Sequence, residues 1–279
     1  MIIVRLKYRL GNQMFQYALG RCLAQKLNEE LFLDTTWLEQ NKGAALNLDY
    51  RLHMFNIKAK IIDRLSADLL PRALVISVHE NTVGFFEEVL HLRAPKPGAL
   101  ILTGTWQSQK YFIEAADAIR KEFTLVNFPN EERGLADIID STCAVAVHVR
   151  RGDYVSSQLG AHLGFVGLDY YDRAISILTD RVPDAHFFVF SDDIDWCAAN
   201  LKLRQPHTFV ARSSSDTFVI EDFHLMSRCS HFIIANSTYS WWAAWLSSKT
   251  DKVIVAPNRW FGDKQWDSSH IIPATWIVT

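Results

Sequence analysis

Polar side chains follow three apolar runs in the second half of the chain, at the points where these runs end. The runs are 145–147, 187–190 and 232–235, and they lead into His148 to Asp153, Ser191 to Asp193, and Asn236 to Thr238. Apolar runs that alternate with helical patterns indicate parallel strands buried on both faces. Because ligands bind at the edge where the carboxyl ends of parallel strands meet, we expect these clusters to form one site.

His148 and Arg150 lie two residues apart on an extended segment, so their side chains share a face. The guanidinium of an arginine offers a bidentate fork that suits phosphate oxygens. Two structural interpretations stay open, because Arg150 could form an ion pair with Asp153 and His148 could be a hydrogen-bonded core histidine. The spacing of His148 and Arg150 is therefore typical of residues that contact a phosphate, but it is also compatible with the two structural interpretations.

Ser237 and Thr238 precede a helical run at 239–246. A hydroxyl at this position usually caps the helix, and the free N–H groups of a helix start also bind anions. The two interpretations are compatible, and a pyrophosphate would then lie between Arg150 and this helix start. The tryptophans at 241, 242 and 245 are predicted to be core residues of the helix.

Asp192, Asp193 and Asp195 form an acidic cluster that could hold a divalent ion beside a diphosphate. The preferred interpretation is that Asp193 or Asp195 caps a helix that begins near Trp196, and that Asp192 accepts hydrogen bonds. The sequence contains no GxGxxG, P-loop, GxSxG, HExxH or zinc-type Cys/His spacing. We therefore expect neither a metal site nor a Rossmann dinucleotide site.

The composition indicates a globular protein, with 49% hydrophobic and 22% charged residues in a chain of 279. A formal net charge of −2 argues against a nucleic-acid-binding surface. The four cysteines have no CxxC spacing, so we expect free buried thiols. The sequence starts without a signal-peptide pattern and has no run of about 18 uncharged apolar residues, so we expect a cytoplasmic protein without a membrane span.

The first half is predicted to open with a strand, a glycine turn and a helix whose N-cap is Asn12. Residues 40–95 have weak periodicity and are predicted as loops and short helices. A composition break around Pro129 places the domain division at 135, which gives an α/β protein with domains 1–135 and 136–279. The remaining predictions are strands at 2–6, 31–33, 99–103 and 252–256, helices at 110–122 and 131–140, a helix capped by Asp169, and one that begins at Asp216.

Three blocks of the sequence, in order, resemble the bacterial α-1,2-fucosyltransferases of glycosyltransferase family 11. They are GNQMFQYA from Gly11, HVRRGDY from His148, and NSTYSWWAAWL from Asn236, and the TWQS that starts at Thr105 also fits. The resemblance spans nearly the whole chain. It implies a GT-B-like fold, in which two Rossmann-like domains with parallel sheets face a central cleft. It also implies GDP-fucose as the donor, inversion at the fucose anomeric carbon and no essential metal.

The same resemblance implies roles for individual residues. Arg150 would contact the donor diphosphate, and Asp153 is the carboxylate best placed by the motif to act as a general base, although it could instead orient Arg150 or Arg151. Acceptor-side candidates are Gly11, Asn12, Gln13 and Trp106, with Trp37 and Trp106 predicted to stack on sugar. Donor-side candidates are His148, Asp192, Asn236, Ser237 and Thr238.

The chain departs from the family pattern just before the first block, because Tyr8 and Arg9 stand where the family usually has two glycines. The expected partners are GDP-fucose and a galactoside or oligosaccharide acceptor, with no nucleic acid and no integral membrane segment; peripheral contact with a membrane stays open. Two other functions remain as alternatives. One is a metal-dependent sugar transferase that uses the acidic cluster at 192–195, and the other is a non-catalytic lectin-like protein whose site is closed by Tyr8 and Arg9.

Overall fold

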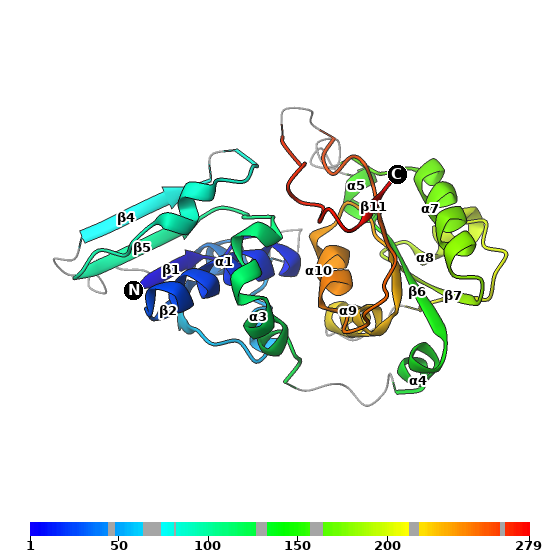
Figure 1. Cartoon of the computed structure of the whole chain (residues 1–279), viewed down its shortest axis with the longest axis horizontal. Coiled ribbons are helices and arrows are strands. Elements are labelled where there is room, and N and C mark those ends of the chain that lie inside the picture. Colours follow the sequence, from blue (N-terminus) through cyan, green and yellow to red (C-terminus); the bar gives the residue numbers. More distant parts are fainter. Residues whose placement is uncertain are drawn as a thin grey trace. The chain divides into compact units, whose positions relative to one another are not determined.

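The computed structural model describes residues 1–43, 48–63, 74–80, 82–126, 133–156, 164–211, 218–262 and 266–279. The chain divides into two compact units, residues 1–127 with 269–271, and residues 128–268 with 272–279. Each unit contains its own parallel sheet with helices packed against it (Figure 1). The predicted α/β class with parallel sheets is therefore confirmed.

The sheet of the first unit has the strand order β3-β2-β1-β5-β4, and every pairing is parallel. The order along the chain reverses between β1 and β5, so the carboxyl ends of these two strands flank the position where open α/β sheets bind ligands. The strands are β1 (Ile2–Arg5), β2 (Leu31–Asp34), β3 (Lys60–Ile62), β4 (Leu74–His79) and β5 (Gly98–Thr103).

Helix α1 (Leu10–Leu27) packs closely on this sheet. A Cβ atom on Gly20 would lie 2.4 Å from Cγ2 of Val4, so only glycine permits this approach of helix and strand. The helix begins after Arg9, which corrects the prediction that Asn12 is its N-cap. Asn12 instead lies within the first helical turn, where its side chain is free to pair with a distant residue.

Two predictions for the first unit are wrong in detail. The segment 40–95 contains the strands β3 and β4 beside its short helices, and the helix expected at 110–122 is two 3₁₀ turns followed by α3. The helical segments are α2 (Thr36–Gln40), α3 (Ala116–Glu122), and 3₁₀ turns at Leu52–Met54, Glu87–His91, Gln109–Tyr111 and Ile113–Ala115.

The sheet of the second unit has the order β11-β10-β9-β6-β7-β8, again with parallel pairs. Here the chain order reverses between β6 and β9. The strands are β6 (Cys143–Val149), β7 (Ala185–Ser191), β8 (His207–Phe209), β9 (His231–Ile233), β10 (Ile254–Ala256) and β11 (Ile277–Val278).

Helices cover both faces of this sheet, with α9 and α10 on one side and α7 and α8 on the other (Figure 1). Val145, Val147 and Val149 of β6 pack with α7, and the residues between them are also buried. This double burial explains the continuous apolar runs in the sequence. The helices are α4 (Arg133–Ser141), α5 (Gly152–Ser156), α7 (Leu168–Arg181), α8 (Ile194–Asn200), α9 (Phe218–Arg228) and α10 (Thr238–Leu246).

The structure settles several helix predictions in this unit. Trp241 and Trp242 of α10 are fully buried with ring centroids 5.1 Å apart, which confirms them as core residues. The N-cap of α7 is Gly167 instead of Asp169, and the predicted helix start at Asp216 lies outside the described residues. All four cysteines are free, as expected, and three of them are buried.

The division between the units falls earlier than position 135, between residues 127 and 128. Helix α4 contacts α9 and β6, and its Ile139 is 1% exposed, so this helix is part of the second unit. Residues 269–271 belong to the first unit, where the hydroxyl of Ser108 donates to the carbonyl of His270 at 2.8 Å. Among the described residues, no helix combines the length and the apolar character needed to cross a membrane.

Candidate active site

The three polar clusters predicted from the sequence do meet at one edge of the second sheet. The end of β6 reaches the end of β7 through Arg150, whose Nη1 lies 3.0 Å from Oδ2 of Asp192. The end of β6 reaches the end of β9 and the start of α10 through two further contacts. The ring of His148 lies 5.6 Å from that of Tyr239, and the hydroxyl of Tyr154 donates to the carbonyl of Asn236 at 3.0 Å.

Arg150 is oriented by the ion pair with Asp192, in which the two side chains are 21% and 10% exposed. Its guanidinium carbon also lies 5.8 Å from the centre of the Tyr154 ring. The ion pair of Arg150 is thus formed with Asp192, whereas the predicted alternative named Asp153, whose side chain lies outside the described part of the structure. The predicted role of Asp153 concerns a side chain outside the described part of the structure, and its backbone belongs to the short helix α5.

Asp192 stays ionised because several donors surround it. Its Oδ1 accepts a hydrogen bond from the backbone N–H of Arg151 at 2.8 Å. Burial opposes ionisation, but the Arg150 guanidinium and the N–H groups of Arg151 and Gly152 outweigh it and hold the Asp192 pKa below its usual range. A Cβ atom on Gly152 would lie 2.8 Å from Oδ2 of Asp192, so any larger residue here would make the Asp192 carboxylate shift.

Asp193 has the structural role predicted for it. Its Oδ1 accepts the N–H of Trp196 at 3.3 Å and caps α8, and its Oδ2 forms an ion pair with Arg151. Asp192 and Asp193 of the acidic cluster are thus each paired with an arginine. Within the described ranges, no group of three His, Cys, Asp or Glu side chains is arranged to hold a metal ion.

His148 is a buried, neutral imidazole. Burial and the nearby Arg150 hold the His148 pKa well below its ordinary value. Within the described residues its Nδ1 has no hydrogen-bond partner, although the ring is only 5% exposed. A buried polar atom without a partner is costly, so this nitrogen is a natural contact for a bound molecule.

Two residues at the start of α10, Asn236 and Ser237, have different roles. Ser237 is the N-cap with an extended backbone, yet its side chain makes no cap hydrogen bond. The Nδ2 of Asn236 donates to the carbonyls of Gly164 and Trp260 at 2.8 and 2.9 Å. Asn236 therefore holds two loops together, while Ser237 and Thr238 are placed at the helix start as expected.

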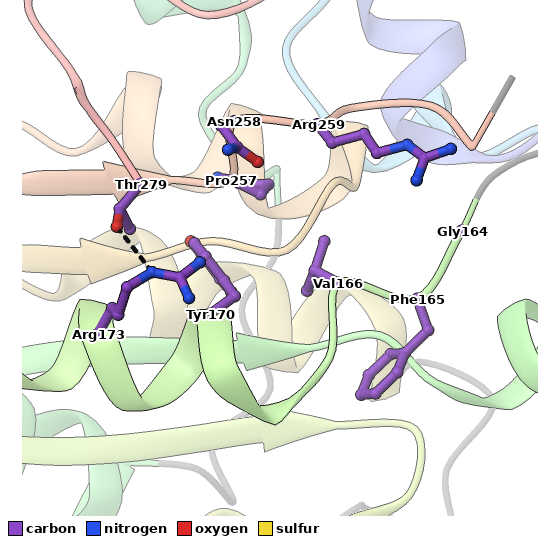
Figure 2. A pocket seen from close by; sticks show the side chains of 9 residues that line it. All are labelled: Gly164, Phe165, Val166, Tyr170, Arg173, Pro257, Asn258, Arg259 and Thr279. Carbon is purple, nitrogen blue, oxygen red and sulfur yellow. Dashed lines mark hydrogen bonds between the residues drawn. The ribbon is translucent and has the colours of Figure 1, made fainter. Parts of the chain in front are cut away.

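A small cavity of about 180 Å³ lies beside this edge, at the carboxyl end of β10 (Figure 2). Its walls come from residues 164–166, from Tyr170 and Arg173 of α7, and from 257–259, and Arg173 Nε donates to the Thr279 hydroxyl at 3.1 Å. None of the donor-side residues predicted from the sequence lines it.

Most acceptor-side candidates of the first unit are buried or hydrogen-bonded within that unit. Gln107 Nε2 donates to Oδ1 of Asn12 at 2.7 Å, which joins α1 to the loop after β5. Gln13 is fully buried, and its Nε2 donates to the carbonyls of Tyr8 and Asp49 at 2.8 Å each. Gly11 is buried in the first turn of α1.

Trp106 does not offer a face to a sugar, which corrects the stacking prediction for this residue. It is 1% exposed and packs edge-on against Tyr111, with ring centroids 5.7 Å apart. Its left-handed backbone, with φ of 53°, is held by Glu80, whose Oε2 accepts the N–H of Trp106 at 3.2 Å and that of Thr105. Burial raises the Glu80 pKa. The sequence reasoning missed Glu80 because it missed β4, the strand that precedes it.

Comparisons with known proteins agree with this architecture. The chain is 32% identical over 292 residues to an alpha-1,2-colitosyltransferase of Escherichia coli, covering 99% of this chain and 98% of the relative. It is 30% identical to the O-antigen biosynthesis glycosyltransferase WbnK of Escherichia coli, covering 96% and 97%. It is 31% identical to galactoside alpha-(1,2)-fucosyltransferase 1 of Mus musculus, covering 86% of this chain and 61% of the relative.

Two solved structures share the fold at low identity. POFUT1 in complex with GDP-fucose has a TM-score of 0.53 and 12% identity, with 91% of this chain and 97% of that chain covered. NodZ alpha-1,6-fucosyltransferase co-crystallised with GDP has a TM-score of 0.50 and 14% identity, with coverages of 87% and 91%. The fold is thus the GT-B type of these fucosyltransferases. The family model "Glycosyl transferase family 11" matches residues 1–278, and the chain therefore belongs to glycosyl transferase family 11.

Proposed function

We propose that this glycosyltransferase transfers fucose from GDP-fucose, with inversion, to the 2-hydroxyl of a terminal galactose in a glycan acceptor. The observation that carries the proposal is that Arg150 follows β6, one of the two strands between which the strand order reverses, while His148 at the end of the same strand lies against Tyr239 in the first turn of α10. A cationic fork and a helix start are both groups that bind phosphate. The names of the relatives, which include α-1,2 transferases, support the linkage.

The proposed reaction is a single displacement. The acceptor hydroxyl attacks the anomeric carbon of fucose, the bond to the diphosphate breaks, and GDP leaves with the negative charge that develops. Arg150 and the N–H groups at the start of α10 would stabilise that charge, because they are oriented before the reaction begins. His148, held neutral by burial and by Arg150, would donate or accept a hydrogen bond on the nucleotide without adding charge.

The acceptor hydroxyl must also lose its proton. By the family motif, we assign this step to Asp153, which follows Arg150 by three residues. A general base typically contributes roughly 10²–10⁴-fold to the rate. The variant Asp153→Asn should therefore lower kcat by a factor in this range while binding GDP as the wild type does. An Asp153→Asn enzyme with wild-type kcat would exclude Asp153 as the base.

The test begins with calorimetry of GDP binding in metal-free buffer containing EDTA. Release of GDP from GDP-fucose is then measured against a panel of β-galactosides, and the product linkage is determined by NMR. We expect turnover without added metal, since the carboxylates of Asp192 and Asp193 are already paired with Arg150 and Arg151. Turnover that is lost in EDTA and restored by Mn²⁺ or Mg²⁺ would overturn the metal-free proposal.

A second candidate donor deserves a parallel measurement because one relative at 32% identity is named a colitosyltransferase. Colitose is fucose without the 3-hydroxyl, so the same diphosphate contacts serve both sugars. GDP-colitose and GDP-fucose should be compared by kcat/KM on the same acceptor. A higher value for GDP-colitose would replace fucose as the donor sugar and leave the rest of the proposal intact.

A further inference from the structure

Tyr8 is an exposed aromatic residue in the turn that joins β1 to α1. Its backbone is left-handed, with φ of 66°, and the residue is 44% exposed. This region of φ favours glycine and disfavours residues with a Cβ atom. The turn itself therefore does not account for a tyrosine at this position.

Two buried amides hold the turn in this conformation. Gln16 Oε1 accepts the N–H of Lys7 at 3.0 Å, and Gln13 Nε2 donates to the carbonyl of Tyr8 at 2.8 Å. Both glutamines are fully buried on α1. The two glutamines of α1 thus fix the backbone on both sides of Tyr8, and this fixed backbone determines the direction of the Tyr8 side chain.

The ring of Tyr8 lies against Trp37, a residue of α2 that follows β2. The two ring centroids are 5.4 Å apart at 58°, and Nζ of Lys7 lies 5.9 Å from the Trp37 centroid. Strands β1 and β2 are parallel neighbours, and Arg5 pairs with Asp34 at their carboxyl ends. We call this pair of rings at the carboxyl edge of the first sheet the Tyr8–Trp37 platform.

We propose that the Tyr8–Trp37 platform binds the apolar C–H face of a pyranose ring in the acceptor, with the Lys7 ammonium donating to a hydroxyl at its border. The proposal rests on the proposed function, in which the acceptor is a glycan. The face of an aromatic ring carries partial negative charge and attracts polarised C–H groups. Tyr8 follows β1, one of the two strands between which the order reverses, and Trp37 follows the neighbouring strand β2, so both rings come from the carboxyl edge at which such sheets bind ligands.

A purely structural explanation is that Tyr8 only covers Trp37. The variant Tyr8→Gly separates the two explanations, because glycine adopts the left-handed turn without strain and removes the ring. We expect this variant to melt at the wild-type temperature or above. Its acceptor KM should rise about 5- to 30-fold, while its affinity for GDP stays unchanged. Tyr8→Phe should keep the acceptor KM within about twofold, because stacking requires the ring and not the hydroxyl.

Trp37→Leu tests the second ring, and Phe32→Leu is the matched control. Phe32 is also an aromatic residue with a lysine beside its ring, because Nζ of Lys60 lies 5.5 Å from the ring centre. It lies within β2, however, and not at the carboxyl edge of the sheet. We expect Trp37→Leu to raise the acceptor KM as Tyr8→Gly does, and Phe32→Leu to leave it at the wild-type value. Wild-type acceptor KM in both Tyr8→Gly and Trp37→Leu would overturn the platform while leaving the proposed function intact.

Direct binding makes the test independent of turnover. Saturation-transfer difference NMR with methyl β-galactoside and lactose, on protein with GDP bound, should show sugar C–H signals that disappear in Tyr8→Gly. If the wild type transferred no sugar but showed these Tyr8-dependent signals, the platform would stand and the proposed function would fall. If neither sugar gave a signal with the wild type, or if the signals persisted in Tyr8→Gly, the platform would be overturned.

Discussion

Replacement of Arg150 by alanine tests the diphosphate site most directly. A hydrogen bond to a charged group contributes about 1.5–3 kcal/mol, and about 1.4 kcal/mol corresponds to a factor of ten in affinity. The loss of one such bond from Arg150 should therefore weaken GDP binding by about 10- to 150-fold. Because the diphosphate gains negative charge as the sugar leaves, kcat should fall further, by on the order of 10²–10³.

The same change also affects stability, and this effect must be separated from binding. Arg150→Ala removes the cation that faces the 10% exposed carboxylate of Asp192. The carboxylate keeps its hydrogen bond from the Arg151 N–H, so we expect the free energy of unfolding to fall by about 2–3 kcal/mol, below the full cost of an orphaned buried charge. The double variant Arg150→Ala/Asp192→Asn should recover much of this stability without recovering GDP affinity.

The assay is calorimetry with GDP at a temperature well below the melting temperature of every variant. Arg228→Ala is the matched control, because Arg228 also pairs with an aspartate, Asp140, but on the surface of the second unit. This control should bind GDP like the wild type. A folded Arg150→Ala protein with wild-type GDP affinity would refute the assignment of Arg150 to the diphosphate.

Three further predictions concern the groups that support the site. Burial lowers the pKa of His148 in the folded protein, whereas the unfolded chain has the ordinary value of about 6.5. Below that pH the unfolded chain binds more protons, so the free energy of unfolding decreases as the pH falls. Urea denaturation of His148→Gln should show a smaller decrease in the free energy of unfolding between about pH 7 and 5. Gln16→Leu leaves the Lys7 N–H and the Gly104 carbonyl unpaired and should lower the urea-derived free energy of unfolding by about 2–4 kcal/mol. Gly152→Ala should weaken GDP binding in calorimetry, because its Cβ would displace Asp192.

Each of these predictions has a contrary outcome. Identical pH slopes in wild type and His148→Gln would show that the imidazole ring of His148 titrates normally. An unfolding free energy of Gln16→Leu within about 0.5 kcal/mol of wild type would show that the turn at Tyr8 is not held by that amide. Wild-type GDP affinity in Gly152→Ala would show that the position of Asp192 is irrelevant to the donor site.

Much of the second unit could be predicted because its central strands are long and apolar on both faces. The predicted runs 145–147 and 187–190 lie inside β6 (Cys143–Val149) and β7 (Ala185–Ser191). The strands that were missed are short or exposed. β4 is an edge strand whose apolar run, Leu74 to Ile76, is short and 38% to 63% exposed, so it lacks the long buried run that marks the central strands.

The candidate site shows the same limit. The residues at the strand ends could be found from the sequence, but their partners could not. Arg150 pairs with Asp192, which is 42 residues away, and Asn12 accepts from Gln107, which is 95 residues away, instead of capping its own helix. Local spacing predicts local partners, whereas these pairs form only when the strand order brings distant loops together.

The sequence by itself determined the α/β class, the central strands and the polar clusters at their ends, because side-chain periodicity and burial are properties of consecutive residues. Tertiary structure alone decided which strand ends are neighbours, since the order within each sheet reverses at β1/β5 and at β6/β9. It also decided the left-handed turn at Tyr8, which its own residue type disfavours. Gln13 and Gln16 hold that turn through hydrogen bonds from the buried face of α1, and a tyrosine is thereby accommodated at the first of the two positions where the family resemblance implies glycine.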